Sequence, residues 1–245
     1  MDVTIFELAV FLGATFVAAV VVGVSGFAFA LIAAAVWLHV LTPLQTATLT
    51  ISYGMMVQSY GAWKLRHAVR WSRIWPFLLG GAIGVPIGVF VLRWANPAHL
   101  RAGIGAFLVL YAIYGLARPS LPSVRAGTGA DVGVGLVSGI LGAMTGFAGI
   151  LIVIWSGLRG WSRDVQRGVF APASVALLAM CALALGATGS IARETVALFF
   201  LGLPVLLAGN WIGLRLYGRL NEAGFRRVVL ILLLLSGLPL IATLM

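Results

Sequence analysis

The sequence predicts an all-α polytopic membrane protein with two inverted-topology repeats of about five apolar segments each. Hydrophobic residues make up 62% of the 245-residue chain and charged residues only 9%, whereas a soluble domain carries about 25% charged residues. The charges gather between long apolar runs, as in chains that cross a bilayer as helices. A glycine motif also occurs once in each half, and we expect short or broken helices there.

The glycine motif is Ser25-Gly26-Phe27-Ala28 in the first half and Thr145-Gly146-Phe147-Ala148 in the second. Because glycine can leave helical geometry, we expect the next helix to begin inside the membrane, with free N–H groups and a positive dipole end. Ser25 and Thr145 are suited to cap that helix or to donate a hydroxyl to a ligand. Two such ends related by inversion would form a small anion site. The alternative is that the glycines only allow close helix packing.

The apolar segments fall into two sets that lie on either side of a proline-containing linker. The first repeat is predicted over residues 1–117, the linker over 118–127 and the second repeat over 128–245. The apolar segments are expected at about 4–22, 27–41, 44–63, 74–93 and 99–117, and then at about 130–145, 147–158, 165–186, 195–214 and 225–244. Segments 27–41 and 147–158 are shorter than the ~20 residues needed to cross a bilayer, which predicts half-helices there.

Other matched positions extend the repeat beyond the glycine motif. Gln45 aligns with Gln166, and Gly84 and Gly88 align with Gly209 and Gly213. Gly80, Gly84 and Gly88, spaced four apart, give their helix a smooth face, so we assign them to helix packing,.

The positive charges predict how the chain is oriented. If residues 64–73 are cytoplasmic and each half crosses the membrane an odd number of times, only Arg93, Arg101 and Arg193 of the sixteen bases lie outside. This distribution follows the positive-inside rule. We therefore expect inverted repeats in the cell inner membrane, with both termini non-cytoplasmic. The net charge is +10, but the lysines and arginines lie at the ends of apolar segments, so no soluble domain offers a basic face. The expected partner is therefore the lipid bilayer, and no nucleic acid.

The segment at 44–63 is unusually polar. Gln45, Thr48, Ser52 and Ser59 share one helical stripe,. Such a face avoids lipid, and it either lines a polar cavity or makes interhelical hydrogen bonds. Cavity lining is favoured for Gln45 and Thr48.

The second half offers further polar candidates. Arg167, Ser174 and Cys181 share a stripe, and Gln166 matches the glutamine of the first half. Arg167 is suited to meet an anion as a fixed charge, although an interfacial arginine that snorkels to water is the slightly preferred reading. Asn210, near the middle of its segment, is a candidate cavity donor.

The sequence argues against several classes of chemistry. The six acidic residues lie nearly all at segment ends, which disfavours sodium coupling through buried carboxylates. The single cysteine, Cys181, excludes an internal disulfide and a cysteine-based metal site. The three histidines form no metal motif, and no hydrolase or nucleotide-binding motif is present. We expect no enzymatic activity, no cofactor and no metal.

Several short motifs occur in one order over almost the whole chain. They are Gly23–Phe27 and Thr145–Gly149, a Pro43 loop before a polar helix, and GxxxG helices followed by Asn96–Arg101 and Asn221–Arg226. In this order they resemble the sulfite exporter TauE/SafE family of duplicated membrane permeases. The resemblance implies transport, usually export, of sulfite or small organosulfonates. Members of the family often have a second glycine right after Gly-Phe, whereas this chain has Ala28-Phe29 in the first copy and Ala148-Gly149 in the second. The bulky Phe29 would narrow the site or change its ligand.

The expected function is a secondary transporter, and specifically an exporter, of a small sulfur-containing anion such as sulfite or an organosulfonate, working by alternating access. The expected substrate-binding residues are Ser25, Gly26, Phe27, Gln45, Thr48, Thr145, Gly146, Phe147, Gln166, Arg167 and Asn210. Two alternatives stay open, namely an anion channel with a continuous pore and a non-transporting membrane subunit. A homodimer is one candidate assembly.

Overall fold

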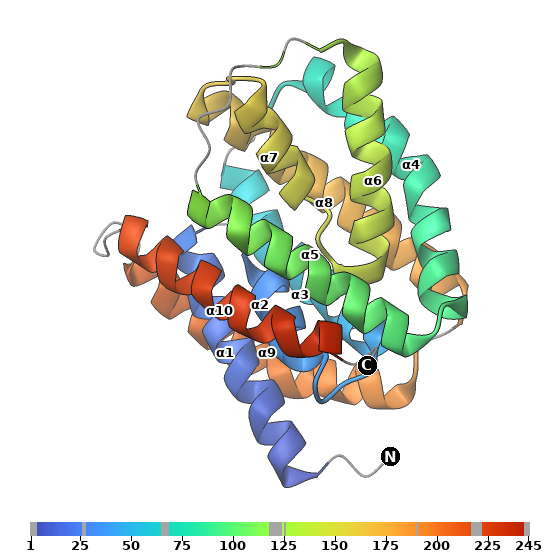
Figure 1. Ribbon diagram of the computed structural model, residues 1–245, viewed down its shortest axis with the longest axis vertical. Helices are drawn as coiled ribbons and strands as arrows, with labels where there is room; N and C mark the ends of the chain where they lie inside the picture. The colour runs from blue at the N-terminus through green and yellow to red at the C-terminus, as the bar shows by residue number, and fades with distance from the viewer. Residues whose placement is uncertain are drawn as a thin grey trace. The chain divides into compact units, whose positions relative to one another are not determined.

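The computed structural model describes residues 4–25, 28–64, 69–117, 124, 126–189, 191–216 and 222–242. Within these ranges the regular elements are ten α-helices (Figure 1). Six of the described helices are long and apolar enough to cross a membrane. The all-helical, multi-pass membrane fold predicted from the sequence is thus confirmed.

The helices match the predicted apolar segments to within a few residues. In chain order they are α1 (Ile5–Ser25), α2 (Phe29–Trp37), α3 (Pro43–Lys64), α4 (Trp71–Trp94), α5 (Pro97–Ala117), α6 (Thr128–Thr145), α7 (Ile150–Leu158), α8 (Arg163–Ala187), α9 (Arg193–Leu216) and α10 (Glu222–Ala242).

The two helices that follow the glycine motifs are short, as the sequence predicts. α2 and α7 contain nine residues each. At 1.5 Å per residue, each is about 14 Å long, roughly half of the ~30 Å hydrocarbon core of a bilayer. Neither helix can cross a membrane alone, so each needs the surrounding helices to shield its ends.

The helices form two compact units. The first unit contains residues 1–46, 95–119 and 192–245, and the second contains residues 47–94 and 120–191. Each unit thus combines helices from both halves of the sequence, and α3 contributes to both. The two sequence repeats, residues 1–117 and 128–245, therefore differ from these two units. The repeats and their inverted orientation stay predictions.

In the second unit, α4 and α6 lie side by side along their glycine faces (Figure 1). A Cβ atom built on Gly84 would lie 2.1 Å from the Leu136 carbonyl oxygen, and one on Gly80 would lie 2.0 Å from the Val132 carbonyl oxygen. On the other helix, a Cβ on Gly135 would lie 2.3 Å from the Phe77 oxygen. The assignment of the α4 glycines to packing is confirmed, because only glycine allows the two backbones to approach so closely.

In the first unit, α1 packs against α9 in the same manner. A Cβ on Gly23 would lie 2.7 Å from both the Asn210 oxygen and the Gly213 Cα, and one on Gly209 would lie 2.8 Å from the Phe16 oxygen. In each unit, therefore, the GxxxG helix of one half packs against the first helix of the other half.

The short helix α2 is fixed by hydrogen bonds to its neighbours in the first unit. Trp37, which is fully buried, donates its indole N–H to the Phe11 carbonyl oxygen of α1 at 3.3 Å. The Ser236 hydroxyl of α10 donates to the Ala35 carbonyl oxygen. These bonds hold the helix that follows the first glycine motif.

Candidate functional site

The second glycine motif forms a tight turn between α6 and α7. Gly146 ends α6 with a φ of 79° and a ψ of 6°, and its N–H donates to the Gly142 carbonyl oxygen at 2.8 Å. This left-handed conformation is open to glycine and costly for other residues. The space is also closed, because a Cβ on Gly146 would lie 2.6 Å from the Thr50 hydroxyl oxygen. Glycine is therefore required here both by the backbone and by packing.

The side chain of Thr145 stabilises the same turn. Its hydroxyl donates to the Leu141 carbonyl oxygen at 2.6 Å and accepts the Phe147 N–H at 3.2 Å. The Thr50 hydroxyl of α3 donates to the Thr145 carbonyl oxygen at 2.9 Å. The Thr145 hydroxyl thus accepts a hydrogen bond from the Phe147 N–H. To donate to a ligand, it would have to break its hydrogen bond to the Leu141 carbonyl oxygen.

The N-terminus of α7 is buried and has no side-chain cap. Its N-cap residue is Gly149, which makes no side-chain cap hydrogen bond. Phe147, Ala148 and Ile150 are at most 8% exposed. The Ile150 N–H, the first of the helix, donates to the Phe147 carbonyl oxygen at 3.3 Å. The next N–H groups have no partner within the helix and lie at its positive dipole end, so this buried terminus favours an anion.

The start of α2 repeats these features, although the first glycine motif is described only in part. Ser25 is the last residue of α1, whereas Gly26 and Phe27 lie outside the described residues. The N-cap of α2 is Ala28, again without a side-chain hydrogen bond. Phe29 is buried and packs edge-on against Trp37, with 6.0 Å between the ring centroids. Its effect on a ligand stays a prediction.

The two matched glutamines both fix the start of a helix. The Gln45 Oε1 accepts hydrogen bonds from the Thr42 N–H and hydroxyl, both at 3.0 Å, and the Thr42 hydroxyl accepts the Gln45 N–H at 3.2 Å. This is a capping box, and its Thr-x-x-Gln spacing is visible in the sequence. Gln166 donates to the Trp161 carbonyl oxygen at 2.8 Å. A cavity-lining role for either glutamine stays a prediction.

The remaining candidates lie on three helices. Thr48 is buried in α3, and Arg167 lies in α8, although its side chain is outside the described part of the structure. Asn210 is half-buried in α9, and its backbone carbonyl lies against Gly23 of α1. Of all the predicted residues, the structure brings Thr145, Gly146 and Phe147 together in one turn.

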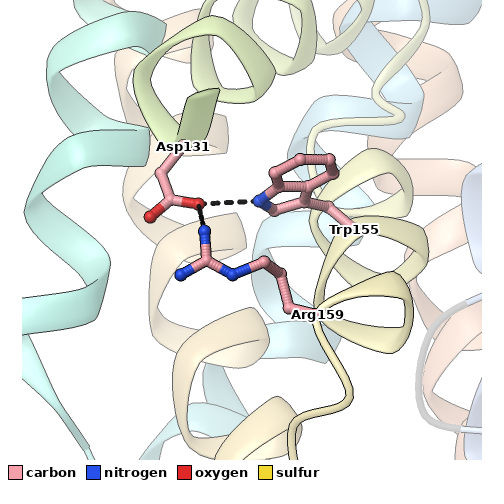
Figure 2. A network of polar contacts seen from close by, with 3 residues as sticks. All are labelled: Asp131, Trp155 and Arg159. Atoms are coloured by element: carbon pink, nitrogen blue, oxygen red, sulfur yellow. Dashed lines mark hydrogen bonds and ion pairs between the residues drawn. The ribbon is translucent and has the colours of Figure 1, made fainter. Parts of the chain in front are cut away.

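A charged cluster that the sequence did not predict joins α6 to the end of α7 (Figure 2). Asp131, only 7% exposed, accepts hydrogen bonds from the Trp155 indole N–H at 2.7 Å and from the Arg159 guanidinium at 3.2 Å. The guanidinium carbons of Arg159 and Arg73 lie 5.6 Å and 4.8 Å from the centre of the Trp161 ring. The pair α6–α7 is thus fixed at one end by the glycine turn and at the other by this cluster.

We expect Asp131→Asn to destabilise the protein by about 1–3 kcal/mol, because the substitution leaves the Arg159 charge without its carboxylate in a largely buried place. The double variant Asp131→Asn/Arg159→Gln should lose less than the sum of the two single variants. Thermal unfolding of the four proteins in detergent measures this coupling. Additive losses would show that the ion pair contributes nothing to the α6–α7 contact.

Comparison with known proteins identifies the family. The chain matches the family described as Sulfite exporter TauE/SafE over residues 11–240. The comparisons with curated proteins and with solved structures each gave no match. The matched range includes both glycine motifs, both short helices and both GxxxG helices. This chain therefore belongs to the sulfite exporter TauE/SafE family.

Proposed function

We propose that this protein is a secondary transporter of the cell inner membrane that exports a small sulfur-containing anion, such as sulfite or an organosulfonate, by alternating access. Membership of the family supports a membrane transporter of sulfur anions such as sulfite. The distribution of the basic residues supports non-cytoplasmic termini,. The choice of anion, the outward direction and the alternating mechanism belong to the proposal.

The observation that supports an anionic substrate most strongly is the buried N-terminus of α7. A helix that starts within the protein interior presents several N–H groups and a partial positive charge where no water can satisfy them. Gly149 provides no side chain to cap this end. A bound anion would accept these hydrogen bonds and would benefit from the helix dipole, by up to about 2 kcal/mol in a partly buried site.

The chemistry around this turn also favours an anion over a cation. Phe147, Ala148 and Ile150 are apolar and buried, and the described polar groups on the turn are backbone amides and the Thr145 hydroxyl. A cation would favour carboxylate ligands, and residues 145–150 contain no aspartate or glutamate. Thr145, Gly146 and Phe147 thus shape the site, and in the proposal Ser25, Gly26 and Phe27 supply the equivalent donors of the first repeat.

The other predicted residues take supporting roles in this proposal. Gln45, Thr48, Gln166 and Asn210 line the polar route to the site, and Arg167 attracts the anion from the cytoplasm. Because Gln45 and Gln166 also fix the starts of α3 and α8, their replacement would change both stability and flux.

We expect purified protein in proteoliposomes to release labelled sulfite, taurine or sulfoacetate faster than empty liposomes do. The flux should saturate, because each transport cycle binds the anion at a limited number of sites. The variant Gly133→Ala is a suitable control, since a Cβ at that position meets no atom within 4 Å, and it should transport like the wild type.

Two results would separate this proposal from its alternatives. If none of the three sulfur compounds moves while sodium or an unrelated neutral solute does, the anion assignment is wrong. If no solute moves although the protein is folded and correctly inserted, the chain acts as a non-transporting subunit.

A further inference from the structure

One buried hydroxyl near the glycine turn stands out among the described residues. Ser174 lies on α8 and is completely buried, and its hydroxyl oxygen has no hydrogen-bond partner among the described residues. Two other buried hydroxyls of the second unit donate to a backbone carbonyl three or four residues earlier, as Ser156 does to Val153 and Thr145 does to Leu141, whereas the Ser138 hydroxyl of α6 also has no partner among the described residues. An unpaired hydroxyl costs free energy in a dry interior, so a hydrogen-bonding ligand beside Ser174 would be favoured.

The Ser174 hydroxyl lies directly against the start of α7. A Cβ built on Gly149 would lie only 2.1 Å from the Ser174 oxygen, which places this oxygen beside the Gly149 backbone. Gly149 is the N-cap of the nine-residue helix α7, and this end has no side-chain cap. The unpaired hydroxyl and the uncapped helix start are two separate features, yet they occur at the same place.

Apolar groups keep water away from this place. The Phe170 ring, one turn before Ser174 on α8, also packs against Gly149, since a Cβ there would lie 2.3 Å from a ring carbon. Ala148, the residue before Gly149, is fully buried. An anion that enters such a site loses its hydration and must regain hydrogen bonds from the protein. Backbone N–H groups and a hydroxyl are neutral donors that suit the several oxygens of a sulfite or sulfonate group.

We infer that the Ser174 hydroxyl donates a hydrogen bond to an oxygen of the anion that binds at the N-terminus of α7. This inference rests on the proposed function, and it adds a substrate-binding residue that selects oxyanions. The O–H of Ser174 contacts one oxygen. The N–H groups of the first turn of α7 that follow Ile150 contact another, since the Ile150 N–H donates to the Phe147 carbonyl oxygen. The close approach of α8 requires glycine at position 149, because any larger residue would fill the space between the helix start and the hydroxyl.

The test compares Ser174→Ala with Ser138→Ala in the same transport assay. Ser138 is the matched control, because it is also fully buried in the second unit with an unpartnered hydroxyl, but it lies in the middle of α6. Both variants should fold as stably as the wild type, since each loses an unsatisfied hydroxyl. We expect the KM for sulfite to rise about tenfold in Ser174→Ala, which corresponds to about 1.4 kcal/mol, and to stay unchanged in Ser138→Ala.

The outcomes distinguish this inference from the proposed function. If the wild type transports sulfite and Ser174→Ala has the same KM, or if Ser138→Ala loses as much, Ser174 does not bind the substrate and the transport function stands. If the wild type transports none of the sulfur anions, the proposed function fails. In that case the thermal stabilisation of wild type and Ser174→Ala by sulfite, sulfate and chloride decides the inference. Equal stabilisation of both proteins, or none, would overturn it.

Discussion

Replacing Gly84 with alanine is expected to abolish the folded protein. The added Cβ would lie 2.1 Å from the Leu136 carbonyl oxygen and 2.9 Å from its carbonyl carbon. Both atoms belong to the backbone of α6, so no side chain can move aside and the two helices must separate. Overpacking of this kind costs about 3 kcal/mol or more, and the separation also removes the close contacts that drive helix association in lipid.

The measurement is the yield of monodisperse protein in detergent and its thermal unfolding midpoint. Gly135→Ala should be equally damaging, because a Cβ there meets the Phe77 backbone of α4 at 2.3 Å. Gly133→Ala on the same helix should behave like the wild type, since no atom lies within 4 Å of its Cβ. Normal folding of Gly84→Ala would contradict the packing of α4 against α6.

Replacing Gly146 with alanine is expected to destabilise the protein by about 2–4 kcal/mol. One part of this loss comes from the left-handed backbone, with a φ of 79°, which costs an L-residue about 1–2 kcal/mol. The other part comes from the contact with α3, because the new Cβ would lie 2.6 Å from the Thr50 hydroxyl oxygen and 2.8 Å from its Cβ. Thr50 also bonds to the Thr145 carbonyl, so it cannot move away without losing that hydrogen bond.

Gly189→Ala separates the two parts of this loss. Gly189 also has a positive φ, 63°, but no atom lies within 4 Å of its Cβ position. The variant Gly189→Ala should therefore lose only the free energy that the left-handed backbone costs. The Tm of Gly146→Ala should be several degrees lower than that of Gly189→Ala. Equal Tm values for the two variants would show that Thr50 does not constrain the turn. Flux should fall further in Gly146→Ala, because the turn positions the start of α7.

Much of the fold could be predicted from the sequence because membrane helices leave a strong local signal. Long apolar runs with charged ends predicted the positions of the helices. The short lengths of segments 27–41 and 147–158 predicted that two of the helices are short. The glycine spacing identified the face of α4 that packs, since only small residues allow such an approach,. The spacing could not name the partner helix, because a smooth face fits any other smooth face.

Contacts between residues that are far apart in the chain could not be predicted from the sequence. Asp131, Trp155 and Arg159 are separated by up to 28 positions, and each alone looks like an ordinary residue at a helix end. The stripe of α8 placed Ser174 on a polar face, but only the structure shows that its hydroxyl lies against Gly149. The capping role of Gln45 was missed because its partner, Thr42, lies outside the apolar segment at 44–63.

Counterflow of labelled sulfite in proteoliposomes tests the central claim most directly. Vesicles loaded with unlabelled sulfite are diluted into a trace of labelled sulfite. A carrier that alternates between two faces should accumulate the label transiently above equilibrium, and the accumulation should saturate as the external sulfite concentration rises. Uptake without any overshoot, rising linearly with concentration, would contradict alternating access and would favour a channel. No uptake of sulfite by folded, correctly inserted protein would contradict its role as a substrate.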